Sequence, residues 1–97
     1  MLKIHKRVLA EIDLVDIWIY SSSQWGPDQA DIYLDQLEHA LLNLAERPLI
    51  GVACDDIHCG YRRFSVGKHQ IYYLIEGEIL HIIRVLGDDM LADLWLE

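Results

Sequence analysis

The stretch YRRFSVGKHQIYYLIEGEILHIIRVL, residues 61–86, contains three apolar segments separated by two short glycine turns. The segments at 61–66, 69–76 and 78–86 are rich in β-branched and aromatic residues, as strands are. Consecutive strands joined by turns as short as Gly-Lys and Glu-Gly-Glu form an antiparallel meander. This stretch therefore predicts the sheet around which the rest of the chain folds.

Two helices are predicted before this sheet. Residues 6–22 carry apolar side chains at helical spacing, and Pro27 suits the first position of a second helix that stops at Pro48. The connection between them is short enough to require an antiparallel hairpin. The stretch LKIH at 2–5 is a candidate first strand, which must join the sheet to satisfy its backbone groups. The order β-α-α-β-β-β predicts an α+β fold, a single domain over 1–97 with the hairpin packed on one face of a small antiparallel sheet.

The first helix is apolar over a wide arc. One face carries apolar residues at spacings of four, three and four, namely Val8, Ile12, Val15 and Ile19. Leu14 and Trp18 form a neighbouring stripe. A helix of this kind has either two packing partners or an exposed apolar flank, and the sequence leaves both open.

Composition excludes several classes of protein. The 97 residues are 53% hydrophobic and 25% charged, which is ordinary for a folded protein with one core. We see no apolar run of the ~20 residues that a membrane span needs and no signal peptide, and the two cysteines suit a reducing compartment, so we expect a cytoplasmic protein. The formal net charge of −8 argues against a protein whose affinity comes from phosphate contacts.

Two groups of residues suggest chemistry but have simpler explanations. Cys54, His58 and Cys59 are spaced C-x3-H-C and lack a fourth ligand at a familiar spacing, so we predict no metal site and no cofactor. His69 and His81 fall on paired strands and could act as an acid–base pair. A sheet histidine with a backbone partner is the commoner case.

Arg84 interrupts the most apolar strand of the chain. A two-residue turn before this strand would place Arg84 on the same face as Tyr73, and a three-residue turn would place it with Tyr72. Together with Arg62 and Arg63, these side chains could position a phosphodiester in a metal-free ribonuclease or anchor a protein partner.

Six motifs, in order and spacing, resemble the ParE branch of the RelE/ParE superfamily of bacterial toxins. They are AEIDLVDIWIY, WGPDQADIYLDQL, RPLIG, CDDI, GYRRFSVGKHQIYY, and IIRVL with Met90 four residues beyond. The resemblance covers almost the whole chain and implies the RelE/ParE-like fold. It also implies the toxin of a type II toxin–antitoxin module, neutralised by a small ParD-like antitoxin within a hetero-oligomer. Such toxins inhibit DNA gyrase by binding and trapping it with cleaved DNA, without catalysis or sequence-specific nucleic-acid binding of their own.

The resemblance also suggests which residues make contacts. The candidates for target binding are Arg62, Arg63, Tyr73, Arg84 and Met90. Arg84 is expected on the exposed face of the sheet, in preference to an ion pair with Glu76, Glu78 or an aspartate of the tail. The antitoxin is expected on the surplus apolar surface of the first helix and the hairpin groove, with Leu14, Trp18, Tyr20 and Trp25 as candidates.

Two alternatives remain at this point. Relatives of the RelE type are ribosome-dependent mRNA endoribonucleases, and the same sheet face could serve that reaction. A degenerate toxin that retains only antitoxin binding is the other. Gly87 and Leu91 stand where ParE-like tails often have histidine and aspartate, which is a departure from the family pattern.

Overall fold

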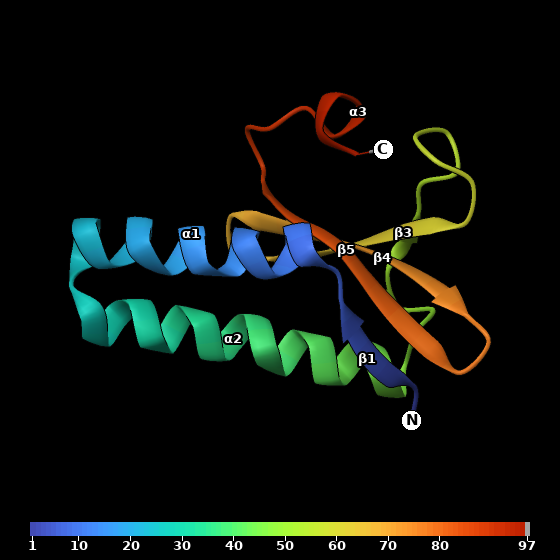
Figure 1. Ribbon diagram of the computed structural model, residues 1–97, viewed down its shortest axis with the longest axis horizontal. Helices are drawn as coiled ribbons and strands as arrows, with labels where there is room; N and C mark the ends of the chain where they lie inside the picture. Colours follow the sequence, from blue (N-terminus) through green and yellow to red (C-terminus); the bar gives the residue numbers. More distant parts are fainter. Residues whose placement is uncertain (97) are drawn as a thin grey trace.

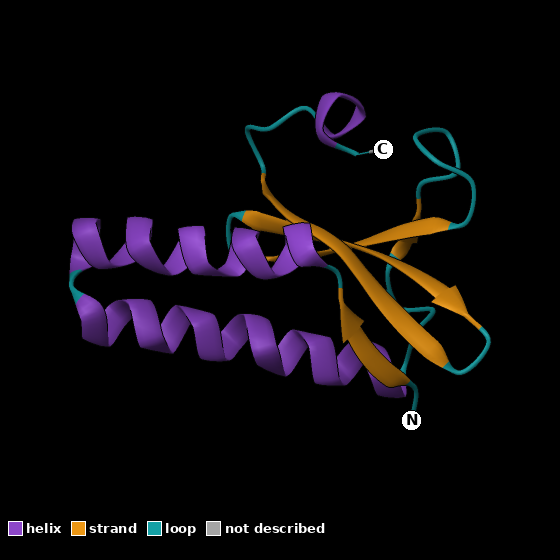
Figure 2. Cartoon of the chain, in the orientation of Figure 1, coloured by secondary structure: helices purple, strands orange, loops and turns teal. Residues whose placement is uncertain are grey.

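The computed structural model of the protein describes residues 1–96 and folds them into a five-stranded sheet with a helical hairpin on one face (Figures 1 and 2). The observed order contains the predicted β-α-α-β-β-β layout and adds a two-residue strand and a last helical turn. None of the described helices is long and apolar enough to cross a membrane. In chain order the elements are β1 (Lys3–Lys6), α1 (Val8–Trp25), α2 (Pro27–Glu46), β2 (Val52–Ala53), β3 (Tyr61–Val66), β4 (His69–Glu76), β5 (Ile79–Gly87) and α3 (Ala92–Trp95).

The sheet has the strand order β1-β5-β4-β3-β2. Strands β3, β4 and β5 form the predicted antiparallel meander. The first strand joins the sheet as expected but runs parallel to β5, with Lys3 opposite Ile79 and Lys6 opposite Ile82. The sheet is therefore mixed, not wholly antiparallel. Parallel pairing requires a long crossover, and the helical hairpin after β1 provides one.

The two helices lie antiparallel and are joined by one residue. Helix α1 continues to Trp25, three residues beyond the predicted end, and Gly26 alone makes the turn. Gly26 has φ 89° and ψ 162°, a backbone conformation that essentially only glycine adopts. Pro27 then occupies the first turn of α2, as predicted, where its missing N–H costs nothing.

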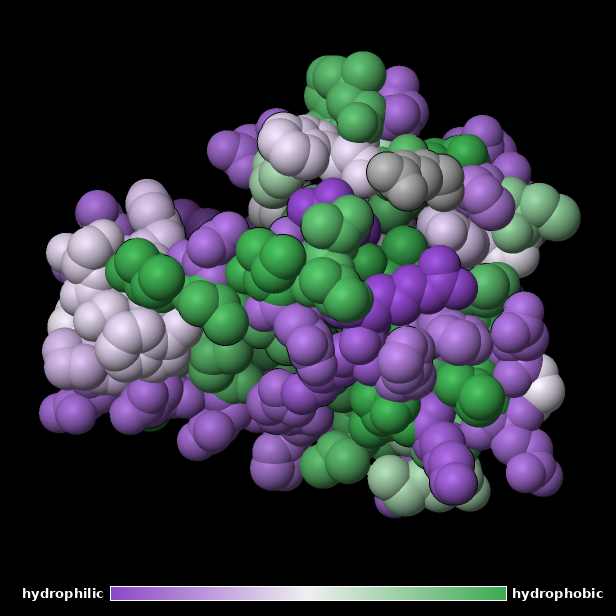
Figure 3. Space-filling model, in the orientation of Figure 1, coloured by the Kyte–Doolittle hydropathy of each residue, from purple (hydrophilic) through white to green (hydrophobic). Residues whose placement is uncertain are grey.

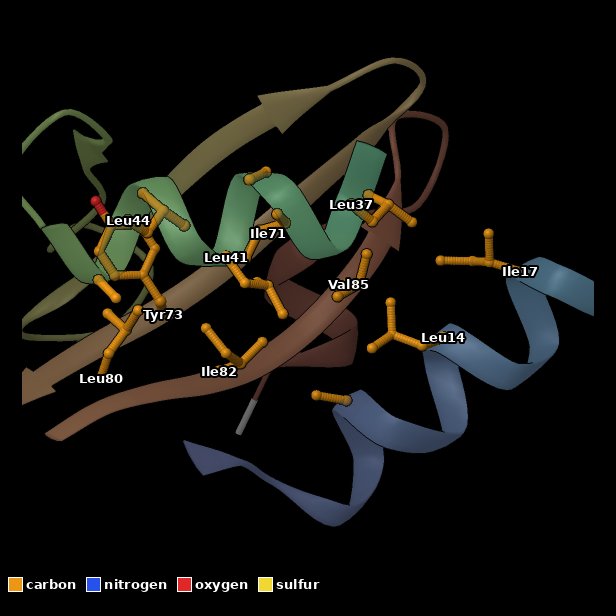
Figure 4. Close-up of a cluster of buried hydrophobic side chains, with 13 residues drawn as sticks. Leu14, Ile17, Leu37, Leu41, Leu44, Ile71, Tyr73, Leu80, Ile82 and Val85 are labelled. Atoms are coloured by element: carbon orange, nitrogen blue, oxygen red, sulfur yellow. The ribbon is translucent and has the colours of Figure 1, made fainter. Parts of the chain in front are cut away.

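The main core lies between the hairpin and the sheet (Figure 4). From α2 the core receives Leu37, Leu41 and Leu44, which are fully buried. From α1 the core receives Leu14 and Ile17. The strands contribute Ile71, Tyr73, Leu80, Ile82 and Val85.

The opposite face of the sheet is covered by the C-terminal segment. After β5 the chain turns back, and α3 lies on the side of the sheet away from α2 (Figure 1). A second buried cluster fills this layer, and Met90 and Leu96 of the tail pack against it. Its buried members are Cys54, Tyr61, Tyr72, Ile83 and Leu86.

The pairing of β4 with β5 contains one irregularity. Glu76 lies opposite Ile79, so the turn has two residues, which predicts that Arg84 shares the face of Tyr73. The register shifts between Tyr72 and Tyr73, however, and Arg84 lies opposite Tyr72. An extra residue in one strand changes the side-chain alternation beyond it, and this bulge sets the position of Arg84.

Candidate functional site

The edge of β5 is open where β1 stops, and Asp13 of α1 closes it. Strand β1 pairs with β5 only as far as Ile82. Beyond that residue, the backbone N–H of Val85 donates to Asp13 Oδ2 at 2.9 Å. A carboxylate from the helix therefore takes the place of the missing strand partner.

The same carboxylate holds Arg84. The guanidinium donates from Nε to Asp13 Oδ2 at 2.7 Å and from Nη2 to Asp13 Oδ1 at 2.8 Å. Its Nη1 donates to the backbone oxygen of Trp95 at 3.1 Å, and the Trp95 ring lies 5.9 Å from the guanidinium carbon. The two side chains are only 12% and 11% exposed. The expectation that Arg84 lies on an exposed face is therefore wrong, because this bidentate pair with Asp13 and the tail enclose it.

Tyr73 and Arg62 fix the segment that follows α2. The Tyr73 side chain is fully buried, and its hydroxyl donates to Pro48 O at 2.6 Å and accepts from Gly51 N at 3.0 Å. Burial raises the pKa of Tyr73, and the Gly51 and Arg62 hydrogen bonds oppose this shift. Arg62 Nη2 donates to the carbonyl oxygens of Leu49 and Gly51 at 3.1 and 2.7 Å. The prediction of Tyr73 as a surface contact is wrong, because its side chain belongs to the core.

The remaining two target candidates come together. Arg63 and Met90 line one cavity of about 550 Å³ on the sheet face, beneath the tail. Burial raises the pKa of Tyr72, another lining residue, although Arg63 beside it lowers that pKa. The rim of this cavity also carries acidic residues, namely Asp56, Asp88 and Asp93. Because one arginine faces several carboxylates, the cavity does not present the basic surface that a phosphate chain requires.

The four antitoxin candidates occupy three different environments. Leu14 is 7% exposed in the core, so its assignment to the binding surface is wrong. Trp18 is partly buried, and its Nε1 donates to Asp31 Oδ1 on α2 at 2.8 Å. Tyr20 and Trp25 are 61% and 63% exposed and contact each other edge to face at 6.3 Å.

The exposed apolar face of α1 is the surface that Val8, Ile12, Val15 and Ile19 form. We call these four residues the α1 stripe; they are 71%, 49%, 59% and 56% exposed. Apolar side chains gather along α1 on the viewed face of the space-filling picture (Figure 3). Of the two possibilities left by the sequence, the structure shows the exposed flank. The sequence shows the helical spacing of these four residues, but they were not among the predicted antitoxin-binding residues. Which face of α1 turns toward the sheet depends on packing, and the spacing alone does not determine it.

His69 and His81 do not form a pair with each other. His69 lies opposite Gly87, whereas His81 lies opposite Leu74, several residues along the same two strands. His69 Nδ1 is 2.5 Å from the Tyr33 hydroxyl, and burial lowers the pKa of His69. His81 Nε2 is 3.5 Å from Glu76 Oε1.

The cysteine-rich connector separates its thiols. Cys54 is buried in the second cluster, and Cys59 is exposed. Burial raises the pKa of the Cys54 thiol. Among the described residues, no group of three or more histidine, cysteine or acidic side chains could hold a metal ion.

Comparison with known proteins agrees with this architecture. A family model described as the ParE toxin of type II toxin-antitoxin system, parDE, matches residues 4–92. The chain is 42% identical over 85 residues to Toxin ParE1 of Mycobacterium tuberculosis, with 87% of each chain covered. It is 40% identical over 83 residues to Toxin ParE1 of Caulobacter vibrioides, covering 86% of this chain and 85% of that protein.

The fold has a counterpart among solved structures. The chain is similar to a structure described as the chromosomal ParDE TA system from P. aeruginosa, with a TM-score of 0.79. The match covers 90% of this chain and 96% of the other at 17% sequence identity, and so concerns the fold alone. With a family model over residues 4–92 and relatives at 40% identity or above, this chain belongs to the ParE toxin family of type II toxin–antitoxin systems.

Proposed function

We propose that this protein inhibits growth by binding DNA gyrase and is neutralised by a ParD-like antitoxin in a hetero-oligomeric complex. The proposed target places its action in the cytoplasm. Membership of the ParE family supports the toxin role, and the solved relative is described as a ParDE system. The observation that carries the antitoxin half of the proposal is the α1 stripe.

The α1 stripe has the properties of a helix-docking surface. Its spacing of four, three and four residues gives a straight apolar line along α1, opposite the face that packs on the core. Contiguous apolar surface with polar borders marks interaction sites. Glu11 and Asp16 border the stripe and are exposed, so the partner segment should be an amphipathic helix with lysine or arginine beside its apolar anchors.

Binding of gyrase is favoured over RNA cleavage by the surroundings of the arginines. Asp13 already neutralises Arg84, and Arg62 donates to backbone carbonyls. Arg63 shares its cavity with acidic residues. The charge of −8 adds a repulsion that a messenger RNA would have to overcome. A binding role at the cavity of Arg63 and Met90 needs no such phosphate neutralisation.

The test combines growth and binding measurements. Induced expression should stop growth, and co-expression of the product of the neighbouring short reading frame should restore it. Ile12→Ser and Val15→Ser should weaken that partner's binding by at least fivefold, the loss of a hot-spot contact. Ile32→Ser is the matched control, because Ile32 is 50% exposed on α2 and Ile12 is 49% exposed. Equal affinities for all three variants would place the antitoxin elsewhere, and growth unaffected by the toxin would contradict the proposal.

A further inference from the structure

Besides the cavity of Arg63 and Met90, a second cavity lies where the closed end of the helical hairpin meets the β3–β4 turn. It is separate from the α1 stripe. Its volume is about 420 Å³, within the ~300–1,000 Å³ typical of ligand pockets. Tyr20 and Trp25 come from α1, Tyr33 from α2, and Lys68 and His69 from the turn and β4. We call this hollow the aromatic pocket.

The floor of the aromatic pocket is held by contacts of the Tyr33 hydroxyl. The Tyr33 hydroxyl lies 2.5 Å from His69 Nδ1, 3.2 Å from Val66 O and 3.3 Å from Lys68 N. Gly67 has φ +55°, and a Cβ at this position would come within 2.8 Å of the Tyr33 ring. Tyr33 therefore fixes the turn from inside, and the close approach depends on a glycine. A floor held in this way needs no reordering when a ligand enters.

The rim of the aromatic pocket is unusually exposed for its composition. Tyr20 and Trp25 are 61% and 63% exposed, although both are large aromatic side chains. Their edge-to-face contact at 6.3 Å holds one against the other. Tyrosine and tryptophan are the residues most enriched in binding hot spots, where they surround or fill apolar pockets. The rim is thus suited to close around an apolar group brought by a partner.

The charge of the pocket indicates which kind of residue should lie beside the partner's apolar side chain. Lys68 is the one side chain with a fixed charge among the described residues that line the hollow. Burial lowers the pKa of His69, which disfavours its charged form. The neighbouring carboxylate of Asp88 already accepts a hydrogen bond from Gln70 Nε2 at 3.1 Å. Lys68 is therefore a local cation in a chain of net charge −8, and it complements an acid.

We propose that the aromatic pocket is a second anchoring site for the antitoxin, taking one large apolar side chain with an acidic residue beside it at Lys68. This inference rests on the proposed function. We take the partner to be a polypeptide, because Tyr20 and Trp25 of the pocket belong to the same helix as the α1 stripe, so that one chain bound along α1 would contact both. The antitoxin should thus carry an apolar–acidic pair within a segment that is otherwise basic.

The test uses the product of the neighbouring short reading frame as the probe and measures its affinity by calorimetry. Tyr20→Ala and Trp25→Ala should each weaken binding by at least fivefold. Lys68→Met should weaken binding at low salt and flatten its salt dependence. Leu49→Ala is the control, because Leu49 is 70% exposed and follows the far end of α2. The indole N–H signal of Trp25, assigned with Trp25→Phe, should shift on binding.

The outcomes separate this inference from the proposed function. Failure of the wild-type protein to bind the probe would overturn both. Binding that is weakened by Ile12→Ser, but changed less than twofold by the three pocket variants, would overturn the pocket alone. A Trp25 signal that does not shift in the complex would also overturn it. Because Tyr20, Trp25 and Lys68 are exposed, their variants should fold, and urea unfolding checks this directly.

Discussion

Replacing Arg84 with alanine removes both charged hydrogen bonds to Asp13 and the contact with the Trp95 ring. Because the partner carboxylate is 11% exposed, it is left almost buried, with the Val85 N–H still donating to it. Breaking a buried pair by removing one partner costs ~3–5 kcal/mol. We expect Arg84→Ala to lower the free energy of unfolding by about 3 kcal/mol, a large part of the stability of a small domain.

A double-mutant cycle in urea measures this pair directly. Asp13→Ala and Arg84→Ala should each destabilise strongly, and the double variant by much less than their sum, giving a coupling of about 2–3 kcal/mol. The slope of the urea transition should stay constant across the cycle. Arg47→Ala is the control, because Arg47 is an exposed arginine, and its change should be about 0.5 kcal/mol.

Growth inhibition by a stable variant distinguishes a structural role of Arg84 from direct contact with the target. Asp13→Asn combined with Arg84→Met replaces the ion pair with neutral groups of similar size, which often restores stability. If Arg84 is structural, this double variant should fold and inhibit growth. A stable but non-toxic double variant would assign Arg84 to the target. A loss below about 1 kcal/mol for Arg84→Ala, with no coupling to Asp13, would show that the pair contributes no more than an exposed ion pair does and would contradict its structural role.

Three further predictions follow from single positions. Tyr73→Phe leaves two backbone groups without their partner and should cost about 1–3 kcal/mol in urea unfolding, yet retain growth inhibition; lost toxicity in a stable variant would contradict this. Gly26→Ala should lower the free energy of unfolding by about 1–3 kcal/mol, because alanine does not readily adopt the backbone conformation of Gly26. An unchanged unfolding midpoint would contradict the role of Gly26 as the single residue that connects the two helices. Because burial lowers the pKa of His69, the unfolded chain takes up its proton first as the pH falls. Stability should therefore drop from about pH 6.5 toward the lower folded-state pKa and level off below it. His69→Gln should reduce this drop, and a pH profile untouched by His69→Gln would contradict the assignment.

Most of the fold could be predicted from the sequence because its signals are local. The glycine turns and apolar runs of 61–86 predict the meander, and Pro27 predicts the start of α2. The parallel pairing of β1 with β5 has no local signal, because it depends on where a long crossover returns the chain. The bulge that moves Arg84 opposite Tyr72 likewise arises from the pairing of two strands.

The candidate site was harder to predict, because burial decides it. Arg84 suggested function by its presence in an apolar strand, but its partner Asp13 is 71 positions away in the chain. Helical spacing places Ile12 and Leu14 on two different apolar faces of α1, but it does not determine which of the two faces packs on the sheet. Tyr20 and Trp25, at the end of the hairpin, were correctly expected to be surplus to the core. Their role in binding remains a prediction.

Gyrase inhibition and message cleavage by the purified toxin are distinguished by comparing the two possible targets side by side. In one reaction the protein is incubated with DNA gyrase, ATP and supercoiled plasmid, and in the other with ribosomes translating a defined message. The proposed function predicts cleaved or relaxed plasmid that disappears when the antitoxin is added, with the message intact. Message cleavage at normal gyrase activity would contradict the account and assign this chain to the ribonuclease branch of its superfamily.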